Sequence, residues 1–505
     1  MALSRADIAA EIDRVRTARV APPQKATGTR RFDGARVDRL TASWQATNVA
    51  IDFELRSDLD RLRARSRDMA KNNEYAIKFL RMVRNNVVGP EGFKLQCRAA
   101  DPNGDADVQA NKAIEAAFER WCRAGNCEVT GRLSFADVCR LQIMALARDG
   151  EMLAGLVRGR GEFGFQLQLM DVARLATFEN RAASGRNNAV INGVEVDQYR
   201  APVAYHLWTG PAVPGDYTRS LQRVPASELM HKFIPLEAEQ TRGIPWMHAG
   251  MRRCNDLNGY REAAVIAARV GASKMGFFQT PDGQPPPPDD KDDDGNFLTQ
   301  ASPGEFGVIP QGYQFQPFNP DYPHQQFESF VKGTLRGISS AWGVAYNSLA
   351  NDLEGVNFSS MRAGAIDERD EWLVIQNFFI GAWLMPIFEI WLESALLKDA
   401  IKLPNGSALP AVKLPKFTEH LWQGRRWQWV DPLKDIEAAI VAINNGLTSP
   451  QRIAAQTGMD VEDVLDQIAE FQKMAKDKGV QLTPGPLPNA GGSSGASAGG
   501  GASEG

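Results

Sequence analysis

Hydrophobic and polar positions divide the first part of the chain into segments with helical periodicity. From Asp52, apolar residues recur every three or four positions in two successive runs, Leu55 to Met69 and Tyr75 to Val83, which predicts two amphipathic helices. Asn72-Asn73 lies between the runs and predicts a helix cap, because an asparagine side chain can satisfy a free backbone N–H group. Further helices are expected over residues 106–123 and Ser134–Ala147.

Between residues 128 and 235 the pattern also includes the alternation typical of strands. Strands are predicted over Met152–Arg158 and Phe163–Met170, with a hairpin turn at Gly159-Arg160-Gly161, and over Ala189–Val196 and Val203–Trp208. The string from Gly159 to Gly164 resembles a phosphate-binding glycine loop. No helix is expected to open after it, which favours the turn over a nucleotide site.

Two helices and an irregular segment between them are predicted in the middle of the chain. The helices are expected over residues 247–275 and over 324–342, where Phe327, Phe330, Val331, Leu335 and Ile338 share one face. The segment 281–295 is rich in proline and aspartate and predicts a solvated loop, followed by short strands over Gly304–Phe318.

The remaining chain is again mostly helical. Residues 343–355 predict a polar loop, and a helix of about forty residues is expected from Asn357, kinked at Pro386 because proline cannot donate a backbone hydrogen bond. Strand-like patterns cover Val412–Phe417 and Arg426–Val430. Three short helices follow, one ending at Asn444-Asn445-Gly446, one opening at Ser449-Pro450 and one capped by Asp460, before a Gly/Ser/Ala-rich tail from residue 484.

Composition is that of an ordinary globular protein, and the mixture of helix and strand patterns indicates an α+β fold. Its 505 residues, 43% hydrophobic and 23% charged, suffice for two to four structural regions. The five cysteines are scattered, which argues against a disulfide framework, and Cys122 and Cys127 lack a second ligand pair for zinc. No signal peptide is evident, and polar residues interrupt Trp372–Leu397, so we expect a buried helix rather than a membrane span, and a cytoplasmic compartment.

Charge is distributed unevenly along the chain. Residues 1–100 hold 20 Lys and Arg against 12 Asp and Glu, whereas the whole chain has a net charge of −4, so the remainder is acidic. The basic N-terminal part could contact nucleic acid or a partner, or its cations could lie on solvated helix faces. An acidic remainder differs from the net basic surface of a protein that holds DNA tightly.

Motifs of catalysis are missing from the sequence. The five histidines are well separated, and neither a His-Glu-x-x-His string nor a Walker phosphate loop occurs. Gly-x-Ser-x-Gly strings occur only in the Gly/Ser/Ala-rich tail, where no strand-to-helix elbow is expected. Asp290, Asp292, Asp294 and Gly295 match the first half of a calcium loop, but Ala301 stands where a bidentate glutamate is needed. We therefore expect no catalytic, cofactor or metal site. A DNA-processing hydrolase whose carboxylates converge in space remains an alternative.

Several strings resemble the portal proteins of lambda-like, long-tailed bacteriophages. In chain order they are RSRDMAKNNEYA (65–76), NNVVG (85–89), HKF (231–233), QTRGIP (240–245), GVAY (343–346), NDL (351–353), NFSSMRAG (357–364), DPLK (431–434) and GLTS (446–449). Together they span about residues 50–475. Phe358 stands where we expect tyrosine, and the insert at 281–295 is peculiar to this chain.

The resemblance implies a portal fold and a ring, a dodecamer, at one vertex of a capsid in the virion, assembled in the bacterial host cytoplasm. Its regions would be an N-terminal arm (1–50), a mixed α/β wing (51–246), a stem of two helices (247–275 and 324–342), a small β-rich clip (276–323), a channel loop (343–358), a long wing helix with strands (359–432), a helical crown (433–476) and a tail (477–505). Its partners would be double-stranded DNA, a terminase that supplies ATP chemistry, and capsid, scaffold and head-tail joining proteins, with no membrane. Another head or tail connector is the remaining alternative.

Candidate DNA contacts are assigned within this resemblance. Lys332 and Arg336 could form rings of cations by repetition around the channel, or could form salt bridges between subunits. Asn347, Asn351, Asp352 and Asn357 in the loop could touch DNA without binding it strongly. Asp352 could equally cap a turn, and Asn357 could cap the following helix.

Overall fold

The computed structural model describes residues 48–209, 220–272, 276–279, 314–317, 326–354, 358–427, 432–456 and 461–479, with Arg39 and Ser43. The chain divides into a unit over Met1–Ala50 and a unit over Ile51–Gly505, and every element below belongs to the second. Five predictions lie outside the described residues: nearly all of the N-terminal arm, the loop at 281–295 with its calcium-like string, the cap at Asp460, the Gly/Ser/Ala-rich tail and Asn357.

The two predicted N-terminal helices are confirmed as α2 (Ile51–Asn72) and α3 (Glu74–Val87). Asn73 separates them in an extended conformation, and its side chain accepts a hydrogen bond from the backbone N–H of Ala76 at 2.9 Å. This is the expected N-cap, which satisfies one of the free donors of α3. Leu59 and Phe79 belong to the buried stripes of the two helices.

The next two helices are also confirmed, as α4 (Val108–Trp121) and α5 (Phe135–Asp149). The side chain of Ser134 caps α5, and Gly150 ends it with a left-handed φ of 86°. A side chain at Gly150 would collide with the backbone of Ile244, since an added Cβ would lie 2.4 Å from the carbonyl carbon. Glycine is therefore required both by its φ and by the close approach of a second chain segment.

A three-stranded antiparallel sheet follows α5, in the order β3-β2-β8. Its strands are β2 (Met152–Arg158), β3 (Phe165–Leu169) and β8 (Leu229–Lys232). Leu156 pairs with Leu167 across the first hairpin. Gly159 and Gly161 have positive φ angles in the turn, so the glycine-rich string forms the predicted hairpin and opens no helix.

A four-stranded antiparallel sheet contains the strands predicted near Ala189–Val196 and Val203–Trp208. Its strands are β4 (Ala189–Ile191), β5 (Val194–Val196), β6 (Pro202–Trp208) and β7 (Leu221–Pro225). The predicted range Ala189–Val196 holds two short strands, β4 and β5. Asn192 and Gly193 take φ angles of 49° and 85° and reverse the chain, as Asn-Gly favours in two-residue hairpins. A second small core, including Leu153, Leu175 and Leu207, packs against this sheet.

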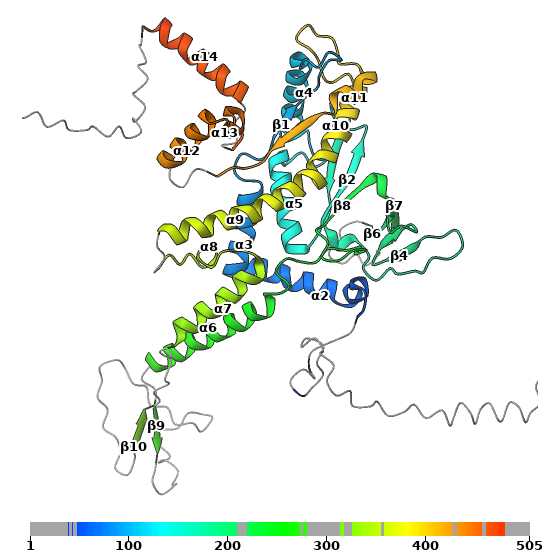
Figure 1. Ribbon diagram of the computed structural model, residues 1–505. Helices are drawn as coiled ribbons and strands as arrows, with labels where there is room; N and C mark the ends of the chain where they lie inside the picture. Colours follow the sequence, from blue (N-terminus) through cyan, green and yellow to red (C-terminus); the bar gives the residue numbers. More distant parts are fainter. Residues whose placement is uncertain are drawn as a thin grey trace, which may run out of the picture. The chain divides into compact units, whose positions relative to one another are not determined.

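Helices α6 (Met251–Ala272) and α7 (Phe327–Trp342) lie side by side in opposite directions (Figure 1). Tyr260 stacks on Phe327 with ring centroids 5.5 Å apart, and the indole N–H of Trp342 donates to the carbonyl of Met247 at 3.2 Å. Beyond the paired helices, β9 (Gly276–Gln279) pairs antiparallel with β10 (Gln314–Pro317). Both predicted helices are confirmed with slightly shorter bounds.

The segment after α7 is less irregular than expected. It contains a five-residue helix, α8 (Tyr346–Ala350), which lies between left-handed residues Gly343 (φ 67°) and Asn351 (φ 54°). Its five residues, with Tyr346 and Leu349 as the larger apolar side chains, are too few to show a helical period, so this helix could not be predicted from its own pattern.

The predicted long helix is confirmed as α9 (Phe358–Phe379), a π-helical segment (Ile380–Leu384) and α10 (Met385–Leu397). The N–H of Met385 bonds to the carbonyl of Ile380, five residues back, immediately before Pro386. The wider turn accommodates a proline that cannot join the regular ladder.

By length and composition, Met361–Leu397 could cross a membrane. In the described fold, however, Trp383, Ile387 and Trp391 of this helix are fully buried in the main core. The buried amide of Gln376 donates to the carbonyls of Val87 and Arg425. These contacts are those of a core helix that packs against α3 and α4.

The strand expected over Val412–Phe417 is also wrong. Ala411–Lys413 is a 3-10 turn (η6) and Leu414–Phe417 is the short helix α11, in which Pro415 occupies the first turn that favours proline. The strand lies just beyond, as β11 (His420–Gln423), paired antiparallel with β1 (Lys94–Cys97). Residues 424–427 have no regular structure, and 428–430 lie outside the described residues.

Three helices complete the described fold, as expected. They are α12 (Pro432–Asn444), α13 (Pro450–Gln456) and α14 (Val461–Asp477). Gly446 follows α12 with a φ of 70°, and the Ser449 hydroxyl accepts from the N–H of Arg452 to cap α13.

Candidate functional site

Five of the six predicted DNA-contact residues lie on one continuous segment, the end of α7 and the α8 turn. Lys332 and Arg336 are one turn apart on α7, Asn347 is in α8, and Asn351 and Asp352 follow it. The structure brings Lys332 together with Asp352, and Arg336 together with Tyr346, which the sequence did not single out. The sixth residue, Asn357, lies outside the described residues.

Lys332 is surrounded by carboxylates of its own chain. Its ammonium lies 2.6 Å from Glu328, 3.1 Å from Glu354 and 3.6 Å from Asp352. These contacts, with Glu328 first, raise the pKa of Lys332. The lysine charge is thus more than balanced by carboxylates of its own chain.

Tyr346 contacts Arg336 directly and is connected to Lys332 through Asp352. The guanidinium of Arg336 lies over its ring, 5.4 Å from the centroid, and its hydroxyl donates to Asp352 at 2.7 Å. Burial, followed by this hydrogen bond, raises the pKa of Tyr346 to about 12. Asp352 also accepts from the N–H of Glu354 at 3.0 Å, so it does cap a turn. Its pKa is lowered, first by the Tyr346 hydroxyl.

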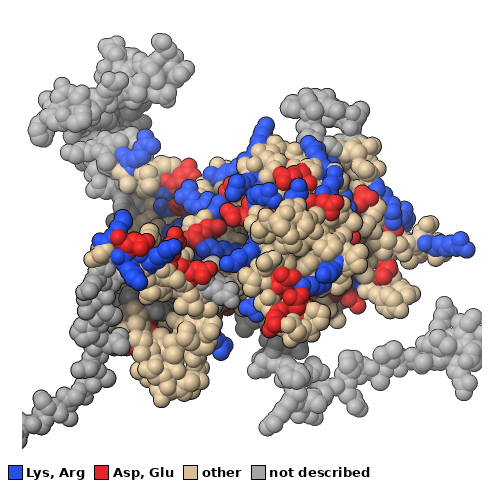
Figure 2. Space-filling view, turned by 90° about the horizontal axis from the view of Figure 1, so that it is seen from above, with Lys and Arg blue, Asp and Glu red and all other residues tan. Residues whose placement is uncertain are grey.

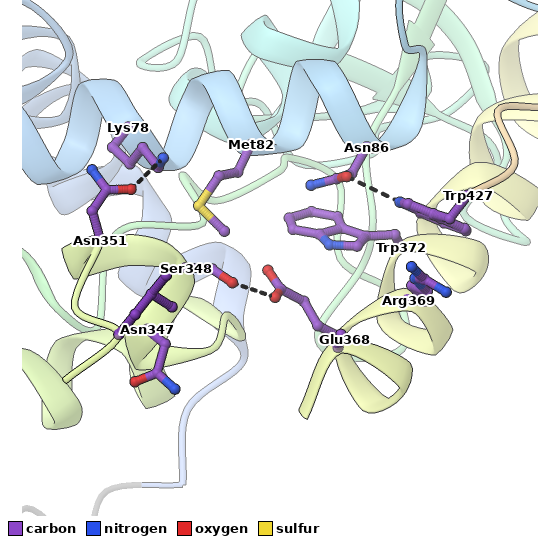
Figure 3. Close-up of a pocket in the computed structure, with 12 residues that line it drawn as sticks. Lys78, Met82, Asn86, Asn347, Ser348, Asn351, Glu368, Arg369, Trp372 and Trp427 are labelled. Carbon is purple, nitrogen blue, oxygen red and sulfur yellow. Dashed lines mark hydrogen bonds between the residues drawn. The ribbon is translucent and has the colours of Figure 1, made fainter. Parts of the chain in front are cut away.

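Two polar contacts join the α8 segment to more distant helices (Figure 3). The ammonium of Lys78 on α3 donates to the side-chain oxygen of Asn351 at 2.8 Å. The hydroxyl of Ser348 donates to Glu368 on α9 at 2.7 Å, and burial raises the pKa of this carboxyl. Both contacts lie at a cleft of about 470 Å³, whose other lining residues include Met82, Asn86, Asn347, Arg369, Trp372 and Trp427.

Basic and acidic side chains are interspersed over the face of the molecule seen in Figure 2. Part of the basic excess of the N-terminal region is also used internally. Arg63 lies 3.2 Å from buried Glu151, and Arg67 binds Asp149 at 2.7 Å. These two arginines therefore stabilise the fold and are not available as phosphate ligands.

A buried ion cluster is the largest feature that sequence reasoning missed. Glu151 accepts from Arg242 at 2.7 and 2.9 Å and from the N–H of Gly243 at 2.7 Å, while His231 lies 3.3 Å away. Burial raises the pKa of Glu151, but Arg242 and His231 outweigh burial and hold it well below its usual range. His231 and Arg242 belong to the strings at 231–233 and 240–245, which were a signal for this cluster.

Metal-binding and thiol side chains are the other candidates for chemistry among the described residues. No group of three or more His, Cys, Asp or Glu residues there has the geometry to hold a metal ion. The five cysteines are free thiols, and burial raises the pKa of Cys97, Cys122, Cys127, Cys139 and Cys254. Thiols with raised pKa are poor nucleophiles.

Comparison with known proteins adds an independent observation. Residues 37–376 match the family model described as phage portal protein, lambda family. The chain is 36% identical over 466 residues to the probable portal protein of Halomonas phage phiHAP-1, covering 90% of this chain and 88% of that protein. It is 21% identical to portal protein B of Escherichia phage lambda, covering 84% and 86%.

Solved structures with similarity include the neck of an empty gene transfer agent (GTA) particle, with a TM-score of 0.41 and 13% identity, covering 80% of this chain and 94% of that one. The family match covers more than half of the chain, and the phiHAP-1 relative is aligned over almost its whole length. The chain therefore belongs to the lambda family of phage portal proteins.

Proposed function

We propose that copies of this chain close into a ring, a dodecamer, at the portal vertex of a phage capsid, and that double-stranded DNA passes through its central channel during packaging and ejection. The observation that carries this proposal is the 36% identity to a probable portal protein over 90% of the chain. Ring contacts are heterologous, so one face of a subunit meets a different face of its neighbour.

The described fold supports a division into regions. Paired helices α6 and α7 with the β9–β10 ladder beyond them fit a stem and a clip over 247–342. The body around α2–α5 and the two sheets would be the wing (51–246), completed by the helix and strands of 359–432. Residues 433–476 would be the crown, flanked by the arm (1–50) and the tail (477–505).

We assign the channel lining to Lys332, Arg336, Asn347, Asn351, Asp352 and Asn357. A conduit must hold DNA weakly, because many uncompensated phosphate contacts would trap the duplex and make affinity steeply salt-dependent. Lys332 with its three carboxylate neighbours suits such a channel, since these carboxylates offset its positive charge and keep it from holding phosphate tightly.

The channel would act without chemistry of its own. The ATP-dependent motor step would belong to a terminase, and capsid, scaffold and head-tail joining proteins would be the other partners. The protein would stand in the virion after assembly in the host cytoplasm.

Mass measurement and negative-stain imaging of the purified full-length protein test this proposal. We expect rings of about twelve subunits with a central hole. A protein that stays monomeric under all assembly conditions would contradict it. Incubation with plasmid DNA and Mg²⁺ tests the alternative of a hydrolase, and cleavage by the purified protein would favour that alternative.

A further inference from the structure

Helix α8 is held from two sides by polar contacts. On the α7 side, Lys332 binds Asp352 and Glu354, and Tyr346 joins Arg336 to Asp352. On the other side, Lys78 of α3 binds Asn351 and Glu368 of α9 binds Ser348. A five-residue helix has little stability by itself, so tertiary contacts must set its position.

The backbone makes α8 a discrete unit. Gly343 and Asn351, both in the left-handed region, reverse the chain before and after it. The apolar anchor is Leu349, which is 2% exposed and belongs to the main core, with Tyr346 and Ala350 packed against that core, while Asn347 and Ser348 are half-buried. Reversals at both ends allow α8 to shift as a body when its side-chain contacts change.

The cleft described above lies on the α3 and α9 side of α8. Figure 3 shows Lys78–Asn351 and Ser348–Glu368 spanning from those helices to α8 and the turn after it, with Met82 and Trp372 between them. On this side, α8 is therefore connected to α3 and α9 by two polar contacts beside about 470 Å³ of space that side chains do not fill. The side-chain contacts of Asn351 and Ser348 can therefore be lost on this side while Leu349 stays in the core.

We propose that Lys78 and Glu368 are positioning residues that fix α8, and with it the channel loop, relative to the wing. This inference rests on the proposed function, because the channel loop is part of that proposal. It states that two residues outside the channel, Lys78 and Glu368, determine the position of the loop. Loss of both contacts would leave α8 held by Leu349 in the core and by its polar contacts with α7, so its polar residues would sample a wider range of positions around DNA.

Hydrogen exchange on the purified full-length protein tests the positioning step. In the double variant Lys78→Met with Ser348→Ala, we expect the amides of residues 346–352 to exchange about tenfold faster or more, since two hydrogen bonds are lost. Lys71→Met is the matched control, because Lys71 is an exposed lysine at the end of α2 that makes no ion pair or hydrogen bond among the described residues. Unchanged exchange in the double variant would overturn the proposal.

The conservative variant separates positioning from simple destabilisation. Glu368→Gln keeps an oxygen that accepts from Ser348 and should exchange like the unmodified protein, whereas Glu368→Ala should exchange faster. Equal exchange in both variants would overturn the role of Glu368. If the double variant fails to fold, Ser348→Ala alone provides the same readout.

The link to DNA requires a second measurement. Particles assembled with the double variant should lose packaged DNA at a different rate from those with Lys71→Met, and equal retention despite faster exchange would overturn that link. The contacts lie within one chain, so exchange can be measured whether or not rings form. Absence of rings would overturn the proposed function alone.

Discussion

The guanidinium of Arg242 and the carboxylate of Glu151 form a two-pronged ion pair, at 2.7 and 2.9 Å, with both side chains fully buried. Arg63, His231 and the N–H of Gly243 complete the surroundings of the carboxylate. Charges removed from water are stable only when every partner is present. The cluster therefore joins α2, β2, β8 and the segment after β8 into one interdependent body.

Arg242→Met should lower the unfolding free energy by about 3–5 kcal/mol, because it leaves Glu151 charged, buried and short of a partner. Urea denaturation followed by circular dichroism measures the loss as a lower midpoint. The control is Arg252→Met, which removes a 95% exposed arginine 4.0 Å from Asp256 and should cost about 0–1 kcal/mol. Equal midpoints for the two variants would show that the buried pair is not structurally important.

Acidic pH should destabilise the fold through the same cluster. Burial, the largest cause, lowers the pKa of His231 below 6.5, and the net effect on Glu151 is also a pKa below its ordinary 4.5. The folded state thus binds fewer protons than the unfolded chain. Stability from His231 is fully present above pH 6.5 and is lost as the pH falls, and that from Glu151 is lost below 4.5.

Thermal unfolding between pH 8 and pH 4 measures this dependence. His231→Gln cannot take up the proton, so its melting temperature should change less between pH 7 and pH 5.5 than that of the unmodified protein. Parallel curves for the two proteins over this interval would assign the acid sensitivity to other groups.

Gly243→Ala should destabilise the fold strongly. An added Cβ would lie 2.0 Å from the carbonyl oxygen of Gly150, inside any allowed contact, and the same backbone donates to Glu151. Gly364→Ala is the control, because nothing lies within 4 Å of its Cβ position in α9. That change should stabilise by up to about 1 kcal/mol, since alanine favours the helix. A Gly243→Ala protein with an unchanged denaturation midpoint would contradict the close approach.

Simultaneous replacement of Lys332 and Arg336 by Ala should change DNA packaging or retention while rings still form. Two carboxylates that pair with Lys332 are exposed to solvent: the side chain of Glu328 is 73% exposed and that of Glu354 is 79% exposed. The contribution of these ion pairs to folding is therefore small and screened by salt. Packaged DNA length and ring formation by imaging are the two measurements. Normal packaging by the double variant would remove both residues from the channel assignment.

Local signals predicted local structure well. Asn73 and Ser134 cap α3 and α5 as their residue types indicate, and the glycines of the first hairpin lie in its turn. Asn192-Gly193 carries an equally strong hairpin signal, and it divides the range predicted for strands into β4 and β5. The strand expected at Val412–Phe417 failed because Pro415 suits the first turn of a helix.

The candidate site was predictable only in part. Lys332 and Arg336 stood out by their spacing on one helix face, but their partners Asp352 and Tyr346 come from the chain reversal at Gly343, which periodicity does not describe. Glu151 and Arg242 are far apart in sequence, and each is unremarkable in its own segment. Only tertiary folding brings such charges together, so the family strings marked their positions without revealing the contact.

The π segment at Ile380–Leu384 gives the long helix one residue more than a regular ladder of the same length holds. Trp372 and Gln376 lie before the π segment, and Trp391 lies after it. In a regular helix one additional residue would turn the second flank by about 100° relative to the first. The π segment absorbs this residue, so the side chains of both flanks face the core. Deleting Gly381 together with Pro386→Ala would let a straight helix form with both flanks still in phase. A deletion elsewhere in α9 or α10 would turn one flank's tryptophans out of the core.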